Sequence, residues 1–416
     1  MIAALALVIS LAGCSSHIKD IEAGGTAVVT SDESEKTLPS SVTEPLVTTE
    51  ATTTTEETTA VTTTEEVNTT QEPEPQLVSV RLVCAGDNLI HRSIYNQAKR
   101  RAKDGGYDFD FVYSRVERYI RSADLAILNQ ETIVTDEFEP SDYPRFCSPS
   151  DLGLKMVEIG FDAFSMSNNH VLDKDEDGLL ATLRFWDQID GIVRYGAYKS
   201  DEDMDNIRTL TQNGITFAFL GYMEHTNGLK LNDDAVAKIT YLRETDVIEQ
   251  QIKRAKEIAD VIIVSPHFGT EISNELKSNQ INMARLMIDW GADIIIGTQA
   301  HTVQTMEFVE RDDGTRGFVY YGLGNFVSAQ SNPKALVGII GELTVTKNLD
   351  TGEILIENVK AIPIITQYGY NYSNIHIVPY SEYTDEMLSD HGADGFTQEA
   401  IDKVLSYIPE EYLSVE

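Results

Sequence analysis

The sequence predicts a layered α/β fold for most of the chain, and three observations support this prediction. The chain has 416 residues, 42% of them hydrophobic, which is enough for a large buried core. From residue 77 onward, apolar runs of strand length alternate with segments of helical periodicity. Polar residues follow these runs repeatedly, at the positions where loops beyond the strand ends carry the chemistry of α/β proteins.

The predicted elements follow one another in a regular order. Residues 77–85 alternate and then become wholly apolar, as a strand entering a covered sheet does. Further strands are predicted over residues 124–128, 161–166, 215–220, 261–264, 293–296 and 318–321. Helices are predicted over residues 111–120, 152–159, 176–189, 247–259 and 281–290. Residues 337–347 and 353–366 flank a turn and predict an antiparallel hairpin.

Residues 1–14 have the pattern of a bacterial lipoprotein signal peptide. An apolar run too short to span a bilayer ends in Leu11-Ala12-Gly13-Cys14, which makes Cys14 the expected lipidation site. The alternative is an ordinary signal peptide with a chance cysteine. No Lys or Arg precedes the run, so the true start of translation is expected to lie upstream. Lipidation would anchor the protein to the extracellular face of the cell membrane.

The remaining chain divides into three predicted parts. Residues 15–76 are rich in Thr, Glu and Ser and cannot bury enough apolar area to offset their conformational entropy, which predicts a disordered tether. Residues 77–376 form the predicted folded domain. Residues 377–416 are acidic and loosely helical, and we expect this extension to pack on the outside of the domain.

The charge and the cysteines exclude several classes of partner and site. The formal net charge of −35 argues against nucleic acid, and we expect no basic tract to offset this charge. Cys84 and Cys147 match no zinc-ribbon or redox spacing. A disulfide between them is disfavoured, because we expect Cys84 in a buried strand and Cys147 in an exposed loop.

Polar side chains gather after the predicted strands. We call the short polar segments that directly follow these strands tails. Five successive tails contain Asp87 and His91, Asn129 to Glu131, Ser167 to Asp173, His267 to Glu271, and Gln299 and His301. A single tail of this kind is usually a helix cap or a turn. Five tails that all carry carboxylate, carboxamide or imidazole groups exceed what capping explains. The mixture favours a divalent ion such as manganese, iron or zinc over calcium.

These tails also resemble a known family. The motifs are Gly86-Asp87, Asn129-x-Glu131, Ser167-Asn168-Asn169-His170-x-x-Asp173, Pro266-His267-x-Gly269-x-Glu271, Gly297-x-x-x-His301 and Leu323-Gly324-Asn325-Phe326. Their order and spacing resemble the CapA family of poly-γ-glutamate capsule synthesis proteins over roughly residues 80–326. The resemblance implies a metallophosphatase-like (calcineurin-like) layered β-sandwich flanked by helices.

The resemblance also implies roles for individual residues. One or two divalent ions would be held by Asp87, Glu131, Asn169, His267 and His301, with His91 as a possible additional ligand. His170 would be the catalytic proton donor, oriented by Asp173. Gln299 stands where the family has a histidine, and its neutral carbonyl oxygen is a weaker ligand for a borderline metal. We therefore expect the second ion to be loosely held or absent.

The resemblance implies a cell-surface protein that takes part in the synthesis, export or anchoring of poly-γ-glutamate. The expected partners are this polymer or a phosphate ester as substrate, the membrane through the N-terminal lipid, and membrane subunits of a polymer synthase. One alternative is a non-catalytic surface protein that binds polymer or assists assembly. Another is a general extracellular metal-dependent phosphatase or phosphodiesterase. Two equivalents of transition metal would favour an enzyme, and none would favour a binding module.

Overall fold

The computed structural model describes residues 75–103 and 105–415. The predicted signal peptide, the lipidation site Cys14 and nearly all of the predicted tether lie outside these described residues. None of the helices in the described part of the chain is long and apolar enough to cross a bilayer.

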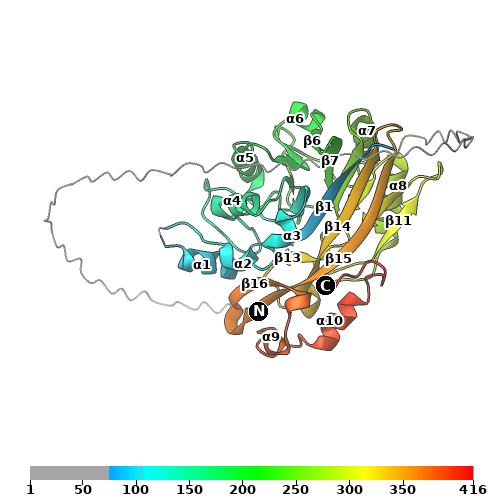
Figure 1. The fold of residues 1–416 in the computed structure, drawn as a ribbon. Coiled ribbons are helices and arrows are strands. Elements are labelled where there is room, and N and C mark those ends of the chain that lie inside the picture. The colour runs from blue at the N-terminus through cyan, green and yellow to red at the C-terminus, as the bar shows by residue number, and fades with distance from the viewer. Residues whose placement is uncertain (1–74, 104, 416) are drawn as a thin grey trace, which may run out of the picture. The chain divides into compact units, whose positions relative to one another are not determined.

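Two β-sheets dominate the folded part of the chain (Figure 1). The first has eight strands in the order β16-β15-β14-β1-β2-β3-β4, with β13 paired to the end of β1. Its strands are β1 (Leu77–Asn88), β2 (Leu125–Asn129), β3 (Ala163–Ser165), β4 (Val193–Tyr195), β13 (Asn325–Val327), β14 (Val337–Asn348), β15 (Ile354–Gly369) and β16 (Ser373–Pro379).

The second sheet has six strands in the order β11-β12-β10-β9-β7-β6. These are β6 (Arg208–Gln212), β7 (Ile215–Met223), β9 (Val261–His267), β10 (Ile294–Ile296), β11 (Met306–Glu310) and β12 (Arg316–Tyr320). A separate small pair joins β5 (Ala197–Tyr198) to β8 (Lys238–Ile239).

The helices of the described residues are mostly short, and all but the last two lie between strands in sequence. They are α1 (Arg92–Arg101), α2 (Asp110–Tyr113), α3 (Glu117–Arg121), α4 (Ser150–Glu158), α5 (Asp175–Trp186), α6 (Asp201–Asp205), α7 (Thr245–Ala255), α8 (Ser278–Trp290), α9 (Asp385–Ser389) and α10 (Gln398–Leu405).

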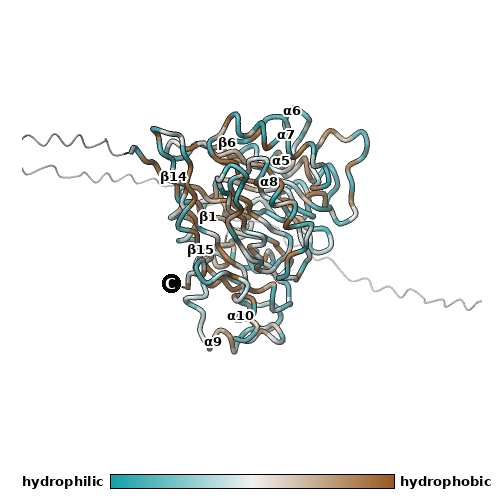
Figure 2. Tube along the Cα trace, turned by 90° about the vertical axis from the view of Figure 1, so that its right-hand side faces the viewer, coloured by the Kyte–Doolittle hydropathy of each residue, from teal (hydrophilic) through white to brown (hydrophobic). Residues whose placement is uncertain are grey.

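The burial pattern of β7 shows how the layers are built. Phe217 and Phe219 belong to the main core, whereas Ala218 and Leu220 belong to a second core beneath α7 and α8. Successive side chains of a strand point to opposite faces, so the second sheet is covered on both sides. Apolar residues concentrate along the strands (Figure 2). The predicted β-sandwich flanked by helices is confirmed.

The parallel strands bring distant segments to a common edge. Strands β1, β2, β3 and β4 pair in parallel, and so do β7, β9, β10 and β12. Parallel strands end at the same edge of a sheet, so the polar tails that follow them meet there.

Several expectations need correction. The single helix expected over residues 111–120 is two short helices, α2 and α3, joined by a turn. The apolar and helical patterns of the sequence did not predict α1, β4, β6, β11 or β16. The expected domain boundary at residue 376 falls inside β16, which continues the first sheet. Beyond it, α10 buries Ile401 and Val404 in the main core.

Both cysteines of the folded part are free and buried. The expectation that they form no disulfide is confirmed. The reason given for it was wrong, because Cys147 is fully buried rather than exposed.

Candidate metal centre

Asp87 lies where three strands of the first sheet meet. At the end of β1 it stands opposite Asn129 of β2 and Asn325 of β13. The residue before it is Gly86, where a Cβ atom would lie 1.9 Å from the carbonyl oxygen of Gly324. Only glycine permits this close approach, and the Asp87 N–H donates to the same carbonyl at 3.0 Å. The Asp87 carboxylate is completely buried.

His301 faces this carboxylate from the loop after β10. Its Nδ1 lies 3.0 Å from Asp87 Oδ2 and 3.0 Å from Asn325 Oδ1. Both partner oxygens are acceptors, so we place a hydrogen on Nδ1. Nε2 is then the ring nitrogen that can bind a ligand. The backbone of His301 is left-handed, with φ of 55°, a costly conformation for a non-glycine residue that is common at functional sites.

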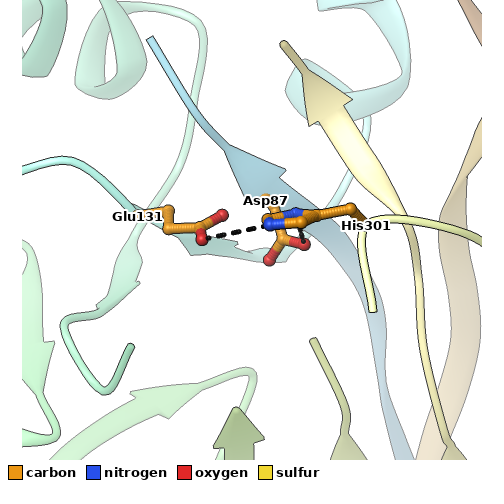
Figure 3. Close-up of side chains that lie close together, drawn as sticks. All are labelled: Asp87, Glu131 and His301. Carbon is orange, nitrogen blue, oxygen red and sulfur yellow. Dashed lines mark hydrogen bonds and ion pairs between the residues drawn. The ribbon is translucent and has the colours of Figure 1, made fainter. Parts of the chain in front are cut away.

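Glu131 lies on the other side of the His301 imidazole, 3.7 Å from Nε2 to Oε1 (Figure 3). Its side chain is fully buried, and neither carboxylate oxygen has a hydrogen-bond partner among the described residues. Burial and the nearby Asp87 carboxylate raise the pKa of Glu131 well above its usual value. A buried carboxylate with no donor is costly unless a cation compensates it.

The charges of these three groups are strongly coupled. Burial disfavours protonation of His301, but the Glu131 carboxylate and the hydrogen bond to Asp87 outweigh it and raise its pKa to about 10. Burial alone would raise the pKa of Asp87, but His301 outweighs this and lowers it. Both shifts show that the site attracts positive charge.

Asp87, Glu131 and His301 can each offer a ligand atom within 4.8 Å of the others. Two carboxylates and an imidazole are a donor set that suits a transition metal or zinc. The unpaired Glu131 oxygens and the His301 Nε2 are the atoms that such an ion would need, and the ion would take the place of a proton on this nitrogen. The residues therefore fit the divalent ion expected from the sequence.

His267 and Asn169 lie next to this group. His267 Nε2 is 3.7 Å from Glu131 Oε1 and 3.2 Å from Asn169 Oδ1, while its Nδ1 is 2.8 Å from Thr298 Oγ1. Burial lowers the pKa of His267 to about 3, which keeps this imidazole neutral and able to bind a metal.

His170 and Asp173 form a second pair beside the first group. His170 Nδ1 lies 2.8 Å from Asp173 Oδ2, which also accepts the backbone N–H of Phe146 at 2.5 Å. The carboxylate therefore fixes the imidazole with its Nδ1 hydrogen directed at Asp173. The ring of Phe146 contacts His170 edge-on, with centroids 4.8 Å apart.

A cavity of about 450 Å³ joins the two groups. Its lining includes Asn169, His170, Asp173, Glu271, His301 and His91, together with Tyr143, Arg145, Phe146 and Asn227. His91 lines this cavity but is not brought into the three-residue group. Its Nδ1 lies 3.1 Å from the Leu89 carbonyl and accepts the Ala329 N–H, also at 3.1 Å.

Gln299 is buried two residues before His301. Its amide nitrogen donates to Glu271 Oε1 at 3.1 Å, and its carbonyl oxygen has no partner among the described residues. Like Glu131, it therefore presents a buried oxygen without a donor. Gln299 is not part of the three-residue group, and its role as a ligand stays a prediction.

Several residues around the site were missed as functional candidates. Asn129 donates to Asp87 Oδ1 at 2.7 Å, and Asn325 and Thr298 hold the two imidazoles. Asn129 and Asn325 stood in the quoted motifs, so their positions carried a signal. No signal in the sequence marked Phe146, because an isolated aromatic residue in a loop does not reveal which ring it packs against.

The fold and the site define this protein as an α/β-sandwich protein with a carboxylate–imidazole centre at the carboxyl ends of its parallel strands. Residues 81–330 match the family model described as "Bacterial capsule synthesis protein PGA_cap". This match covers more than half of the chain, so the chain belongs to that family.

Two relatives extend this finding. The chain is 28% identical over 259 residues to the "Capsule biosynthesis protein CapA" of Bacillus anthracis, which covers 60% of each chain. It is also 28% identical over 252 residues to the "PGA biosynthesis protein CapA" of Bacillus subtilis (strain 168), covering 59% of this chain and 62% of the relative. The matches thus span about three fifths of these curated relatives.

Solved structures show a more distant similarity. A novel phosphatase from Mycoplasma pneumoniae aligns with a TM-score of 0.42 and 15% identity over 70% of this chain and 95% of its own. The NAD nucleotidase NadN of Haemophilus influenzae aligns with a TM-score of 0.43 and 14% identity. This alignment covers 82% of this chain and 58% of NadN.

Proposed function

We propose that this chain is a metal-dependent hydrolase of capsule synthesis, which cleaves a phosphate ester during the synthesis, export or anchoring of poly-γ-glutamate. One observation carries the proposal. The unpaired Glu131 Oε1 lies 3.7 Å from the Nε2 atoms of both His267 and His301, beside a cavity that a fixed imidazole also lines.

The residues of the centre have separate tasks in this proposal. Asp87, Glu131 and His301 would hold the ion, with Asn169 and His267 beside them. A bound divalent ion would polarise the ester and supply hydroxide near neutral pH. The hydrogen bonds from Asn129 and His301 orient Asp87, so this ligand needs little reorganisation.

His170 is the proposed proton donor to the leaving oxygen. Its Nδ1 is held by Asp173, which leaves Nε2 for a substrate in the cavity. The buried Asp173 carboxylate also fixes the direction of the imidazole, so that Nε2 could give a proton to the leaving oxygen as the ester bond breaks.

Family membership supports the biological part of the proposal. The family description and the names of both relatives refer to capsule or PGA biosynthesis. We propose the extracellular face of the cell membrane as the location, with lipid on Cys14 as the anchor, because the first residues have the lipoprotein pattern. Membrane subunits of the polymer synthase are the proposed partners.

The test combines metal content with turnover of the full chain. Elemental analysis is expected to find at least one equivalent of manganese, iron or zinc, and aryl phosphate mono- or diesters are expected to be hydrolysed only with metal. Asp87→Asn and His267→Ala should each reduce both metal content and turnover. A folded protein that binds no metal would refute the proposal and favour a non-catalytic polymer-binding protein.

A further inference from the structure

The C-terminal end of α1 carries four cations in five positions. Lys99, Arg100 and Lys103 are exposed, and Arg101 is half-buried. We call these four residues the α1 basic surface. In residues 75–103 and 105–415, none of the four forms an ion pair with a carboxylate. The composition had led us to expect no basic tract in this acidic chain, and that expectation is wrong.

The α1 basic surface is held firmly on the first sheet. The side-chain amide of Gln97 donates to the Ile375 carbonyl at 2.7 Å and accepts the Ile375 N–H at 2.8 Å, which fixes α1 against β16. Arg101 donates to Asn374 Oδ1 at 3.1 Å, and its guanidinium lies 3.9 Å from the ring centroid of Phe111. Figure 1 shows α1 and α2 beside each other, next to β16. The helix end and the Arg101 side chain are therefore held in place, and the other three cations extend from this fixed end.

A helix end explains only part of this charge. One or two cations in the last turn stabilise the helix dipole. Four cations so close together repel one another, and no carboxylate of residues 75–103 and 105–415 forms an ion pair with them. Asp110 pairs with Lys155 at 2.5 Å, and Glu382 pairs with Arg115 at 2.8 Å. An anionic ligand would supply the missing compensation.

The helix also connects this surface to the cavity. His91 precedes the first residue of α1 and lines the cavity, and the ten residues of the helix span about 15 Å. Arg92 and Lys99 are seven residues apart, so they lie two turns apart on the same face of α1. Arg92 pairs with Asp142 at 3.8 Å, so within the described residues the cations without a carboxylate partner are those at the far end of the helix.

We propose that the α1 basic surface binds a linear polycarboxylate, a segment of the polymer whose synthesis, export or anchoring the protein serves. The chemistry of the polymer rests on the proposed function. A linear chain with one carboxylate per unit can contact several of these clustered cations at once. A bilayer fits less well, because it would need cations spread over a flat face. The net charge of −35 does not prevent binding, because salt screens charges beyond about 8 Å.

The test measures binding of fluorescent poly-γ-glutamate to the full chain. The basic-surface variant carries Lys99→Gln, Arg100→Gln and Lys103→Gln. We expect it to bind about tenfold more weakly at low salt, since exposed charge contacts each add a modest amount. A control with the same change in charge carries Lys253→Gln, Arg254→Gln and Lys277→Gln, on and near α7 and α8. The control should bind within about twofold of wild type.

Two results would overturn the inference. One is equal polymer binding by the basic-surface variant and wild type. The other is that vesicles of phosphatidylglycerol and phosphatidylcholine, or DNA, use the surface more strongly than the polymer does. Hydrolysis of a small aryl phosphate separates this inference from the proposed function. The variant should keep that activity, and an inactive wild type that still binds polymer through α1 would refute only the hydrolase.

Discussion

Substitution of Glu131 can show whether this carboxylate binds a metal ion or only stabilises the fold. At a manganese concentration 100 times its dissociation constant, binding stabilises the folded state by about 2.7 kcal/mol. For the described residues 75–103 and 105–415, about 2.1 cal/mol/K of unfolding entropy per residue gives about 0.7 kcal/mol/K. Manganese should therefore raise the wild-type melting temperature by about 4 °C in differential scanning fluorimetry.

Glu131→Gln should abolish this shift without weakening the metal-free protein. The Glu131 oxygens have no hydrogen-bond partner in the described chain, so the change removes no hydrogen bond, and relief from the nearby Asp87 carboxylate offsets the lost attraction to His301. Glu342→Gln is the control, because Glu342 pairs with Arg81 at 2.5 Å and with Lys360 at 3.2 Å. This variant should melt about 1–3 °C lower yet keep the manganese shift.

The reasoning would be refuted by either of two results. Glu131→Gln could retain the full manganese shift, in which case the ion does not use this carboxylate. It could also lower the metal-free melting temperature as Glu342→Gln does, in which case the carboxylate supports the fold.

Three further predictions concern catalysis, packing and pH. His170→Asn should lower kcat for an aryl phosphate about 100-fold while the manganese shift stays. Gly86→Ala should destabilise the protein by at least about 3 kcal/mol in urea unfolding, because its Cβ would lie 1.9 Å from the Gly324 carbonyl oxygen. Burial would raise the pKa of Asp203, but the hydrogen bond from Arg194 outweighs it and lowers this pKa to about 2. The resulting stabilisation of about 2 kcal/mol is present above pH 4 and lost towards pH 2, which urea unfolding at a series of pH values measures.

Each of these predictions has a result that contradicts it. Unchanged kcat in His170→Asn would remove the proton-donor role. A stable Gly86→Ala protein would mean that β1 can move away from the loop before β13. An Asp203→Asn variant that loses as much stability between pH 4 and pH 2 as wild type would assign the acid sensitivity to other groups.

The sequence predicted the long elements well because their apolar patterns are strong. Strands such as β7 and β9 are buried on both faces, so nearly every residue in them signals a strand. The edge strand β6 has no such pattern, since all its residues are at least partly exposed. Helix α1 was missed because its polar and basic composition hides a narrow apolar face.

The sequence predicted those site residues that the order of the strands brings together at the ends of the sheets. Asp87 lies at the end of β1, and Glu131 and His301 follow β2 and β10, so their meeting agrees with the rule for strand ends. Their supporting contacts depend on side-chain geometry that no spacing encodes. The two acceptors on Nδ1 of His301, for example, come from Asp87 and Asn325, whose strands pair at that position.

The pairing of β1 with both β2 and β13 has a consequence for how the protein reaches its native state. Asp87 and Asn325 are brought into register by strands more than 200 positions apart, and His301 adopts its left-handed backbone between them in sequence. Contacts this far apart form slowly, after much of the chain has been organised. An ion at this centre would therefore be captured only once the whole sandwich has closed. A fragment that ends before residue 300 should not hold one.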